Sequence, residues 1–468
     1  MTLVIPANAF RRIGIAALLT SLVACGGGGG GGAAPVSPVL RCTDELRKDW
    51  VLSTTEDWYL FQDTLPAEVN PAEFETADAL LDFLTESARE QGLDRGFSYL
   101  TTQEEDQSFF GEGQFVGFGL RTRIRAASEL DVLEVFESSP AADAGLARGA
   151  TITAIDAGEG FRSIAEWLVD DPELATALGP AEEGVTRAFR FTLAGELREV
   201  SITKRLVTID PIAESGGTAT LPLAGTAGVG YLNLRTFVST ANSELRDAFA
   251  DFRTAGLTDF IVDLRYNGGG LVATAELLGD LLGAARSNSD VFSRTRFNDA
   301  RAAANDSTRF FRDEAAAVAP VRIAFLTTDY TASASELVIN SMAPWAEVAI
   351  VGDNTFGKPV GQSAFDLAAC GDRLRLVTFR TDNALDQGGY FEGLAPYLTF
   401  ACSAPDDLAR PMGDPAESMT SAALDWLGTG QCGSVIGSAA SRKTLLDAAP
   451  RSVEKATPHR RDELPGVF

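Results

Sequence analysis

Residues 260–270 read FIVDLRYNGGG, an apolar run that leads into polar residues and then into three glycines. The apolar run predicts a buried β-strand over 260–264, and the sequence from Leu271 to Leu282 predicts a helix directly after the glycines. Strands that alternate with helices are typical of an α/β sheet, which we expect over residues 206–435. Further buried strands of this sheet are predicted at Val321 to Thr327 and at Val348 to Val351.

The three glycines could serve one of two kinds of ligand. Glycine-rich turns between a strand and a helix can bind phosphate, but the Walker lysine and the dinucleotide spacing are both missing here. Small residues also let a substrate carbonyl approach bare backbone N–H groups, which is what an oxyanion hole requires. We therefore expect the amide of Gly269 to act as an oxyanion donor, with Gly268 or Gly270 as the alternative.

Composition and charge exclude several classes of function. The chain has 468 residues, of which 45% are apolar and 22% are charged, so its length suggests about three globular domains. A formal net charge of −26 disfavours nucleic acid as a partner. The single histidine, His459, lies in a polar tail, which argues against Ser-His-Asp hydrolysis and most catalytic zinc sites. We expect no metal and no cofactor.

The N-terminus carries the features of an export signal. Arg11 and Arg12 precede a 12-residue apolar stretch, Ile13 to Ala24, which is too short to span a bilayer but suits a signal peptide. The sequence LVAC at 22–25 resembles the lipobox of bacterial lipoproteins, although an ordinary secretory signal with an incidental cysteine is the alternative. We expect residues 1–24 to be removed and Cys25 to be lipidated. Residues 25–40 would then form a glycine-rich tether that holds the protein, facing the periplasm, on the outer rather than the inner membrane.

Four further cysteines, Cys42, Cys370, Cys402 and Cys432, predict two disulfides in an oxidising compartment. A metal site is the weaker alternative, because no histidine or CxxC pair accompanies them. Cys370 and Cys402 bracket two expected strands, 374–380 and 397–400, so we predict that they form a local bridge. Cys42 would then pair with Cys432.

The regions on either side of the main sheet have different patterns. Residues 41–105 are predicted to be helical, with a helix that begins at the Asn70-Pro71 cap and stops at Gly92. Its apolar residues recur at helical spacing and indicate core packing: Phe74, Ala77, Leu80, Leu81, Leu84 and Ala88. Residues 436–468 lose this periodicity and are predicted to be a disordered tail.

Residues 106–205 are expected to be short strands around one small helix that opens at Ser139-Pro140 and closes at Gly145, with a strand from Thr151 to Asp156. The sequence GFGL at 117–120, followed by SPAADAGL at 139–146, resembles a PDZ domain of the bacterial protease type. This resemblance implies that backbone amides of the loop Gly117, Phe118, Gly119 and Leu120 bind the terminal carboxylate of a peptide that adds as a strand. The alternative is that the glycines only make turns. Ala150 departs from the aspartate that is common in such domains.

The sequence TASASE at 331–336 is expected between a strand and a helix, and Lys358 and Gln362 follow it in the chain. Together these residues resemble the carboxyl-terminal processing (tail-specific) protease family over roughly residues 95–400. The resemblance implies an α/β multidomain protein with a crotonase-like protease core and an inserted PDZ domain. It also implies that Ser333 is the nucleophile, Lys358 the general base and Gln362 the partner that orients the lysine.

The residue types fit this chemistry without the family. A serine nucleophile needs a base, and no histidine is available. A lysine can act as the base only when its amine is neutral, which burial favours, and Gln362 can hydrogen-bond that amine without adding charge. The amide of Ala334 would complete the oxyanion hole. Glu336, Thr355 and the flanking glycines are expected to wall the site, with Thr355 steadying the lysine.

The sequence therefore predicts a lipid-anchored serine endopeptidase that cleaves periplasmic or envelope proteins and binds their C-termini through the PDZ domain. A catalytically silent PDZ adaptor of the envelope is the first alternative. A crotonase-like acyl or CoA enzyme is the second, although no basic cluster for its phosphates is evident.

Overall fold

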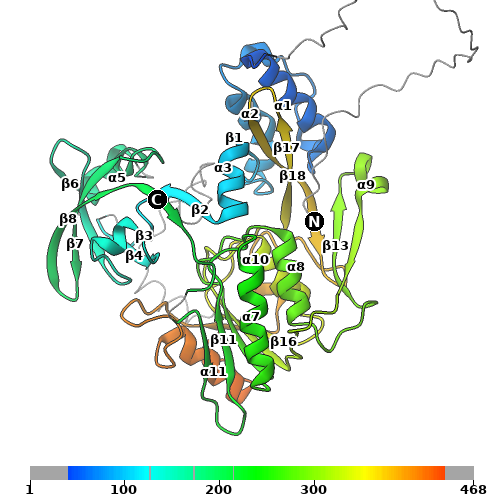
Figure 1. Cartoon of the computed structure of the whole chain (residues 1–468). Helices are drawn as coiled ribbons and strands as arrows, with labels where there is room; N and C mark the ends of the chain where they lie inside the picture. Colours follow the sequence, from blue (N-terminus) through cyan, green and yellow to red (C-terminus); the bar gives the residue numbers. More distant parts are fainter. Residues whose placement is uncertain (1–40, 126–127, 172–173, 214–215, 438–468) are drawn as a thin grey trace, which may run out of the picture.

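The computed structural model describes residues 41–125, 128–171, 174–213 and 216–437. Cys25, the tether and the tail beyond residue 437 lie outside these ranges, so the predictions for them stay predictions. The described chain is a mixed α/β multidomain structure, as the sequence predicted (Figure 1). No helix in the described part is both long and apolar enough to cross a membrane.

The core is a six-stranded sheet in the order β10-β11-β12-β15-β16-β19. The strands from β11 to β19 pair in parallel, and only β10 runs antiparallel. Their bounds are β10 (Thr218–Leu221), β11 (Val229–Asn233), β12 (Asp259–Asp263), β15 (Arg322–Thr327), β16 (Glu347–Gly352) and β19 (Phe400–Ser403). The strands expected at 260–264, 321–327 and 348–351 are therefore confirmed as β12, β15 and β16.

Helices cover both faces of this sheet, which explains why its strands are almost continuously apolar. Phe260 and Val262 of β12 pack toward α7 (Ala241–Thr254), α8 (Val272–Leu281) and α10 (Ala334–Met342). Ile261 points to the other face and packs with Met419 and Trp426 of α11 (Ser418–Thr429). In Figure 1, α7, α8 and α10 lie together on one side of the sheet and α11 lies apart from them.

A second sheet in the order β1-β18-β13-β14 joins the N-terminal region to the core, and β17 also pairs with β18. Its strands are β1 (Tyr99–Thr102), β13 (Val291–Phe297), β14 (Ser307–Phe310), β17 (Val360–Leu367) and β18 (Asp372–Asp382). Helices α1 (Asp44–Trp58) and α2 (Ala77–Glu90) share a hydrophobic cluster with β17 and β18. The remaining short elements of these parts are η1 (Gln62–Thr64), η2 (Pro71–Glu73), α3 (Gln103–Asp106), η3 (Gln107–Gly111), α9 (Asp299–Asn305) and η4 (Ala395–Tyr397).

The predicted start of the N-terminal helix is wrong. Pro71–Glu73 forms only the short 3₁₀ turn η2, capped by the side chain of Asn70. The helix α2 begins at Ala77, where the hydroxyl of Thr76 accepts a hydrogen bond from the amide of Ala79. Both sites carry a good cap, and the downstream cap begins the long helix.

The inserted β-domain lies to one side of the core (Figure 1). Its sheet has the order β3-β4-β5-β7-β8, with β6 paired to β5, and a two-stranded ribbon of β2 and β9 connects it to the rest of the chain. The bounds are β2 (Gln114–Gly117), β3 (Leu120–Ile124), β4 (Leu130–Val135), β5 (Thr151–Asp156), β6 (Phe161–Ser163), β7 (Thr186–Leu193), β8 (Glu196–Thr203) and β9 (Arg205–Thr208). The predicted cap at Ser139 and the strand at 151–156 are confirmed. The described part of the domain contains three short helices rather than one: α4 (Pro140–Asp143), α5 (Ile164–Asp170) and α6 (Ala175–Leu178).

The four cysteines form two disulfides as predicted, but the predicted pairing is wrong. Cys42 is bonded to Cys370, and Cys402 to Cys432. The pairing prediction assumed that the strands around Cys370 and Cys402 are neighbours. They belong to different sheets, because β18 pairs with β1, β13 and β17, whereas β19 pairs with β16.

Peptide mapping without reduction should recover these two pairs and no peptide that links Cys370 to Cys402. Replacing Cys402 and Cys432 with serine should lower the free energy of unfolding by about 3 kcal/mol, because the bridge closes a loop in the unfolded chain. The two cysteines are 30 residues apart in sequence. Urea denaturation of wild type and double variant measures the difference, and equal midpoints would contradict this bridge.

Candidate active site

Three loops meet at the carboxyl ends of neighbouring parallel strands of the core sheet. They follow β12, β15 and β16, and they comprise residues 264–271 (the glycine loop), 328–333 (the serine turn) and 353–359 (the lysine loop). The amide of Ala332 donates to Asn267 O (3.1 Å), and the amide of Phe356 donates to Thr331 O (2.9 Å). Ligands of α/β proteins bind at the carboxyl ends of such strands, so these loops form the candidate site.

Ser333 stands on a strained turn between β15 and α10. Its φ of 55° and ψ of −112° lie in a region that residues other than glycine seldom occupy. The turn fits because Gly269, at φ +110°, lies against it: a Cβ at Gly269 would be 2.9 Å from both Ser333 Cβ and Ala334 N. Ser333 is half-buried. Strain of this kind is concentrated at functional positions, where the surrounding structure maintains it.

The carboxylate of Glu336, in the first turn of α10, joins the serine turn to the lysine loop. Its Oε2 accepts the amides of Ser333 (3.0 Å) and Lys358 (2.8 Å), and its Oε1 accepts the amide of Gly357 (2.8 Å). The backbone nitrogens of Ser333 and Lys358 can therefore be at most about 5.8 Å apart, the sum of the two distances to Oε2. One side chain thus fixes both backbones that carry the predicted serine and lysine.

Glu336 is fully buried, and this burial raises the pKa of its carboxyl. The hydroxyl of Thr355 and the three backbone amides act in the opposite direction, because they stabilise the ionised form. Thr355 also accepts a hydrogen bond from the amide of Leu394 (2.9 Å). The hydroxyl of Thr355 therefore acts on Glu336, and its expected role at the lysine stays a prediction.

Lys358 and Gln362 both contact Phe97, the lysine at its ring and the glutamine at its backbone carbonyl. Lys358 is half-buried, and its Nζ is 4.5 Å from the centroid of this fully buried ring. Gln362, near the start of β17, donates from Nε2 to Phe97 O at 2.6 Å. The structure therefore gathers the three predicted residues in one region, with Ser333 and Lys358 linked by Glu336 and the side chains of Lys358 and Gln362 placed around Phe97.

The backbone amides near Ser333 differ in availability. The amide of Gly269 donates to the side-chain Oδ1 of Asn267 (2.9 Å), so this expected oxyanion donor already has an acceptor. The amides of Gly268, Gly270 and Ala334 have no hydrogen-bond acceptor within the described ranges. The alternative donors, Gly268 and Gly270, are therefore the glycine amides that remain available beside Ala334.

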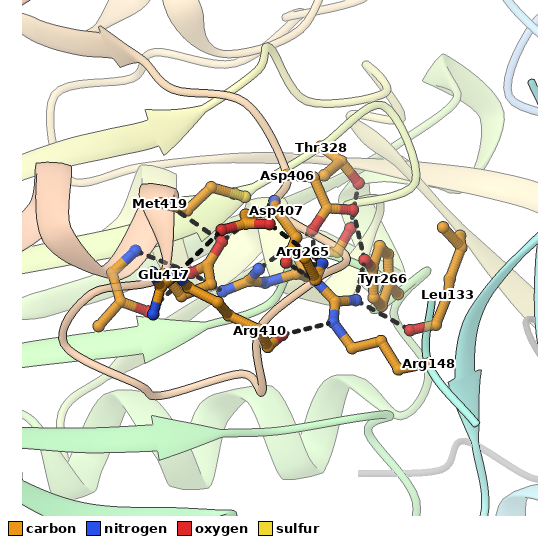
Figure 2. Close-up of polar contacts among 12 residues, drawn as sticks. Leu133, Arg148, Arg265, Tyr266, Thr328, Asp406, Asp407, Arg410, Glu417 and Met419 are labelled. Atoms are coloured by element: carbon orange, nitrogen blue, oxygen red, sulfur yellow. Dashed lines mark hydrogen bonds and ion pairs between the residues drawn. The ribbon is translucent and has the colours of Figure 1, made fainter. Parts of the chain in front are cut away.

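The glycine loop is anchored at its start by a buried ionic network (Figure 2). Arg265, which is fully buried, pairs with Asp263 (2.8 Å), Glu417 (3.1 Å) and Asp406 (3.2 Å). The hydroxyl of Tyr231 donates to Asp263 Oδ2 (2.7 Å). These contacts hold the loop to β11 and to the segment before α11.

The β-domain reaches the same network through Arg148. Arg148 Nη2 lies 2.6 Å from Asp406 Oδ1, and Nη1 donates to the hydroxyl of Tyr266 (2.6 Å) (Figure 2). The Tyr266 hydroxyl in turn donates to Asp406 Oδ2. Burial alone would raise the pKa of Asp406, but Arg148 and Arg265 hold it below its ordinary value. The β-domain is thus bonded directly to residues of the glycine loop.

A second buried ionic cluster joins the β-domain to the end of β11. Arg235 pairs with Glu134 (2.6 Å) and Glu137 (2.6 Å), and Arg121 pairs with Glu134 (3.0 Å). Arg121 also donates to Arg235 O at 3.0 Å. Removing one partner of such a buried cluster typically costs about 3–5 kcal/mol, because a charge is left uncompensated.

The predicted peptide-binding loop belongs to this β-domain and leads into β3, which stands at one end of its sheet. Gly119 has a φ of +82°, and a Cβ there would lie 2.1 Å from Ser139 Cβ. The side chains of Phe118 and Leu120 are buried in the domain core, where Phe118 packs edge-on against Phe189. Any ligand at this loop would therefore meet its backbone rather than these side chains.

Three residues that shape the candidate site were not predicted from the sequence. Asn267 closes an Asx turn onto Gly269, a role that Asn before glycine often has. Asp94 accepts the amides of Phe97 (2.7 Å) and Ser98 (3.2 Å), and Arg95 donates to the carbonyls of the lysine loop. The signal for Asp94 was an acidic residue before a short polar turn, whereas no local pattern marks Arg95.

Replacing Glu336 with glutamine tests its role in joining the two loops. An amide has only one acceptor oxygen, so its NH₂ group would face backbone donors, and we expect the free energy of unfolding to fall by about 1–3 kcal/mol. Burial raises the pKa of Glu336 above its ordinary value of about 4.5, so the folded protein binds a proton at this carboxyl more readily than the unfolded chain does. The contribution of Glu336 to the free energy of unfolding therefore falls as the pH rises through the raised pKa. The deficit of the variant should therefore be largest at acidic pH.

Urea denaturation of both proteins across pH 4–8 measures this deficit. Glu347→Gln is the matched control, because Glu347 is exposed at the start of β16. If the Glu336 and Glu347 variants were equally stable at every pH, Glu336 would not join the loops.

Two family models match the chain: Peptidase family S41 over residues 228–396 and the Peptidase S41 N-terminal domain over residues 47–99. A carboxyl-terminal-processing protease of Synechocystis sp. is 25% identical over 279 residues, which cover 59% of this chain and 61% of the relative. A chloroplastic C-terminal processing peptidase of Tetradesmus obliquus is 26% identical over 292 residues, 58% of each chain. The alignments thus span about six tenths of these relatives.

A solved structure shows the same fold. The crystal structure of a candidate S41 protease from Bacteroides fragilis covers 82% of this chain and 97% of its own, with a TM-score of 0.63 and 24% identity. The matched ranges include the N-terminal helices and all three loops of the candidate site. The core sheet and the N-terminal region of this chain are thus similar to peptidase family S41.

Proposed function

We propose that this protein is a serine endopeptidase of the C-terminal processing type, in which Ser333 is the nucleophile, Lys358 the general base and Gln362 an orienting group. The observation that supports it most directly is the carboxylate of Glu336, which accepts the amides of both Ser333 and Lys358. The choice of residue type also supports it. Only five of the 39 basic residues are lysines, and arginine, which the chain uses elsewhere, cannot release a proton to act as a base.

In the proposed reaction, Ser333 Oγ attacks the carbonyl carbon of the scissile peptide bond while its proton passes to the neutral Nζ of Lys358. The C–N bond then breaks, and the ammonium returns the proton to the leaving amine. Water next gives a proton to Nζ and attacks the ester on Ser333. The serine recovers its proton and the new carboxyl end is released. The strained turn at Ser333 holds the hydroxyl in place throughout.

The developing oxyanion would be held by the amide of Ala334 together with that of Gly268 or Gly270. Gly269 supports the site in another way, because its missing side chain leaves room for Ser333 and Ala334. Oriented amides of this kind stabilise the transition state strongly when water is excluded.

Exchange of Lys358 tests the mechanism. Lys358→Arg should be as inactive as Lys358→Ala, because a guanidinium stays protonated at working pH and cannot accept the serine proton. Ser333→Ala should be equally inactive, whereas Gln362→Ala should retain more activity. Mass spectrometry of an unfolded protein digested by each variant measures the loss, with the exposed-site variant Glu347→Gln as the active control.

Near-normal cleavage by Lys358→Arg would overturn the Ser-Lys assignment. If wild type cleaved no more than Ser333→Ala because neither cleaved at all, the protein would instead be a catalytically silent adaptor; equal cleavage by both would show that Ser333 is not the nucleophile.

We further propose that the β-domain acts as a PDZ module that binds the C-terminal ends of substrate proteins. Two features support this role: the backbone of the loop 117–120, and the position of β3 at one end of its sheet, where an extended peptide can add as a further strand. Its buried bonds to Tyr266 and Asp406 would hold a bound substrate close to the glycine loop. Attachment to the outer membrane through Cys25 remains a proposal from the sequence alone.

Amidation of the peptide tests the PDZ role. Peptides with an apolar C-terminal residue and a free carboxylate should bind at least tenfold more tightly than their C-terminal amides, because a charge-assisted hydrogen bond contributes about 1.5–3 kcal/mol. Calorimetric titration into the Ser333→Ala protein avoids cleavage during the measurement. Equal affinities would show that the loop does not read a carboxylate.

A further inference from the structure

Two basic side chains, Lys358 and Arg95, lie over the ring of Phe97. Lys358 Nζ lies 4.5 Å from the ring centroid of Phe97, and Arg95 Cζ lies 5.6 Å from the same centroid. Arg95 also lies 4.2 Å from the centroid of Phe356, and the two rings are 6.0 Å apart. The two cationic centres can therefore be no more than about 10 Å apart, the sum of their distances to the Phe97 ring.

Arg95 is also bonded to the backbone of the lysine loop. Its Nη2 donates to the carbonyl of Phe356 at 2.9 Å and to the carbonyl of Gly357. These residues directly precede Lys358, and the amides of Gly357 and Lys358 are held from the opposite direction by Glu336. The loop is therefore held through its carbonyls by Arg95 and through its amides by Glu336.

The segment that carries Arg95 is itself fixed by buried bonds. Asp94, which is fully buried, accepts the amide of Phe97 (2.7 Å), the hydroxyl of Ser98 (2.7 Å) and the hydroxyl of Tyr59 (2.9 Å). Gln362 donates to Phe97 O from the neighbouring strand. Arg95 is therefore attached to a rigid turn rather than to a mobile surface loop.

The charged and titratable groups of the segments near Lys358 come from three parts of the chain. They are Arg95 and Asp94 before β1, Glu336 on α10, and Tyr390, a buried residue of the loop after β18 that interacts with Glu336. Asp94 is occupied by the amides and hydroxyls described above, and Glu336 by three amides and Thr355. Arg95 is the one among them that stays positively charged at every working pH.

We propose that Arg95 is a positioning residue for the reaction of Ser333 and Lys358: it holds the lysine loop by two carbonyls and its fixed charge disfavours protonation of the Lys358 amine. This inference rests on the proposed function. A neighbouring cation is one of the established ways in which a protein keeps a reactive lysine neutral. At separations of up to 10 Å, repulsion between two partly buried charges changes protonation by about half to one pH unit.

The pH dependence of kcat/KM tests the proposal on the full chain. In Arg95→Gln, the midpoint of the acidic limb should move to higher pH by about half to one pH unit, because the lysine then stays protonated to higher pH. Arg95→Lys keeps the charge but cannot form the planar two-carbonyl contact, so kcat should fall while the limb stays in place. Arg301→Gln is the matched control, since Arg301 lies 4.3 Å from the Trp58 centroid and donates to Asp57 O.

A second readout does not depend on cleavage. In the Ser333→Ala protein, acylation of the Lys358 amine by a reactive ester, followed by mass spectrometry across pH, gives the midpoint of its protonation. That midpoint should rise by the same amount in Arg95→Gln and stay unchanged in Arg301→Gln. If Arg95→Gln does not fold, Arg95→Lys decides: an upward shift of its limb or its midpoint would overturn the proposal.

The outcomes separate this inference from the proposed function. Unshifted profiles and midpoints in Arg95→Gln, with Lys358→Ala still inactive, would overturn the role of Arg95 and leave the Ser-Lys assignment intact. Activity of Lys358→Arg would overturn the assignment itself, and the role of Arg95 with it.

Discussion

The site depends on one buried carboxylate. Ser333 and Lys358 come from loops that follow different strands. Without bonds between these loops, neither would fix the conformation of the other. Glu336 accepts the amides of Ser333, Gly357 and Lys358, so that the two loops can move only together. Its position in the first turn of α10 also suits a negative charge, because the helix dipole is positive there. The strained backbone of Ser333 persists because this carboxylate holds it.

The distribution of charge explains how so acidic a chain keeps its domains together. Arginines pair with buried acids at two places where the β-domain meets the core, Arg148 with Asp406 and Arg235 with Glu134. Such pairs fix the orientation of the two parts, because each guanidinium has a definite set of partners. Their contribution to net stability is smaller than their number suggests, since each charge must first lose its water. The ionic network therefore defines geometry more than it adds stability.

Much of the fold could be predicted from the sequence, because buried parallel strands and capped helices leave local patterns. The strands β12, β15 and β16 and the helix α8 follow directly from apolar runs and glycines. The helix after Asn70 was placed too early because two good caps compete within six residues, and only packing decides between them. The disulfide pairing was predicted wrongly for a related reason, since the partner of each cysteine depends on which sheet its neighbouring strand joins.

For the candidate site, the sequence suggested residue types but not the contacts between them. Ser333, Lys358 and Gln362 stand in recognisable motifs, yet Ser333 and Lys358 are linked through backbone amides to Glu336, and no motif reveals such contacts. Arg95 could not be predicted from local sequence, because it contacts Phe356 and Gly357, which lie more than 260 residues further along the chain. The contact of Asn267 with Gly269 spans only two positions, and a turn pattern could have identified it.

The disulfide between Cys42 and Cys370 determines how the protein would carry a mechanical load. Cys370 lies in the turn between β17 and β18, so a pull on the chain ahead of residue 42 passes through the sulfur–sulfur bond into that hairpin. The helix α1 begins at Asp44, just beyond the bridge, and stays outside this path. The force is shared instead by the hydrogen bonds of β17 and β18 and by the neighbouring strands β1 and β13. Tension at the N-terminal end would therefore leave the helical region folded and fall on the sheet that contains Gln362.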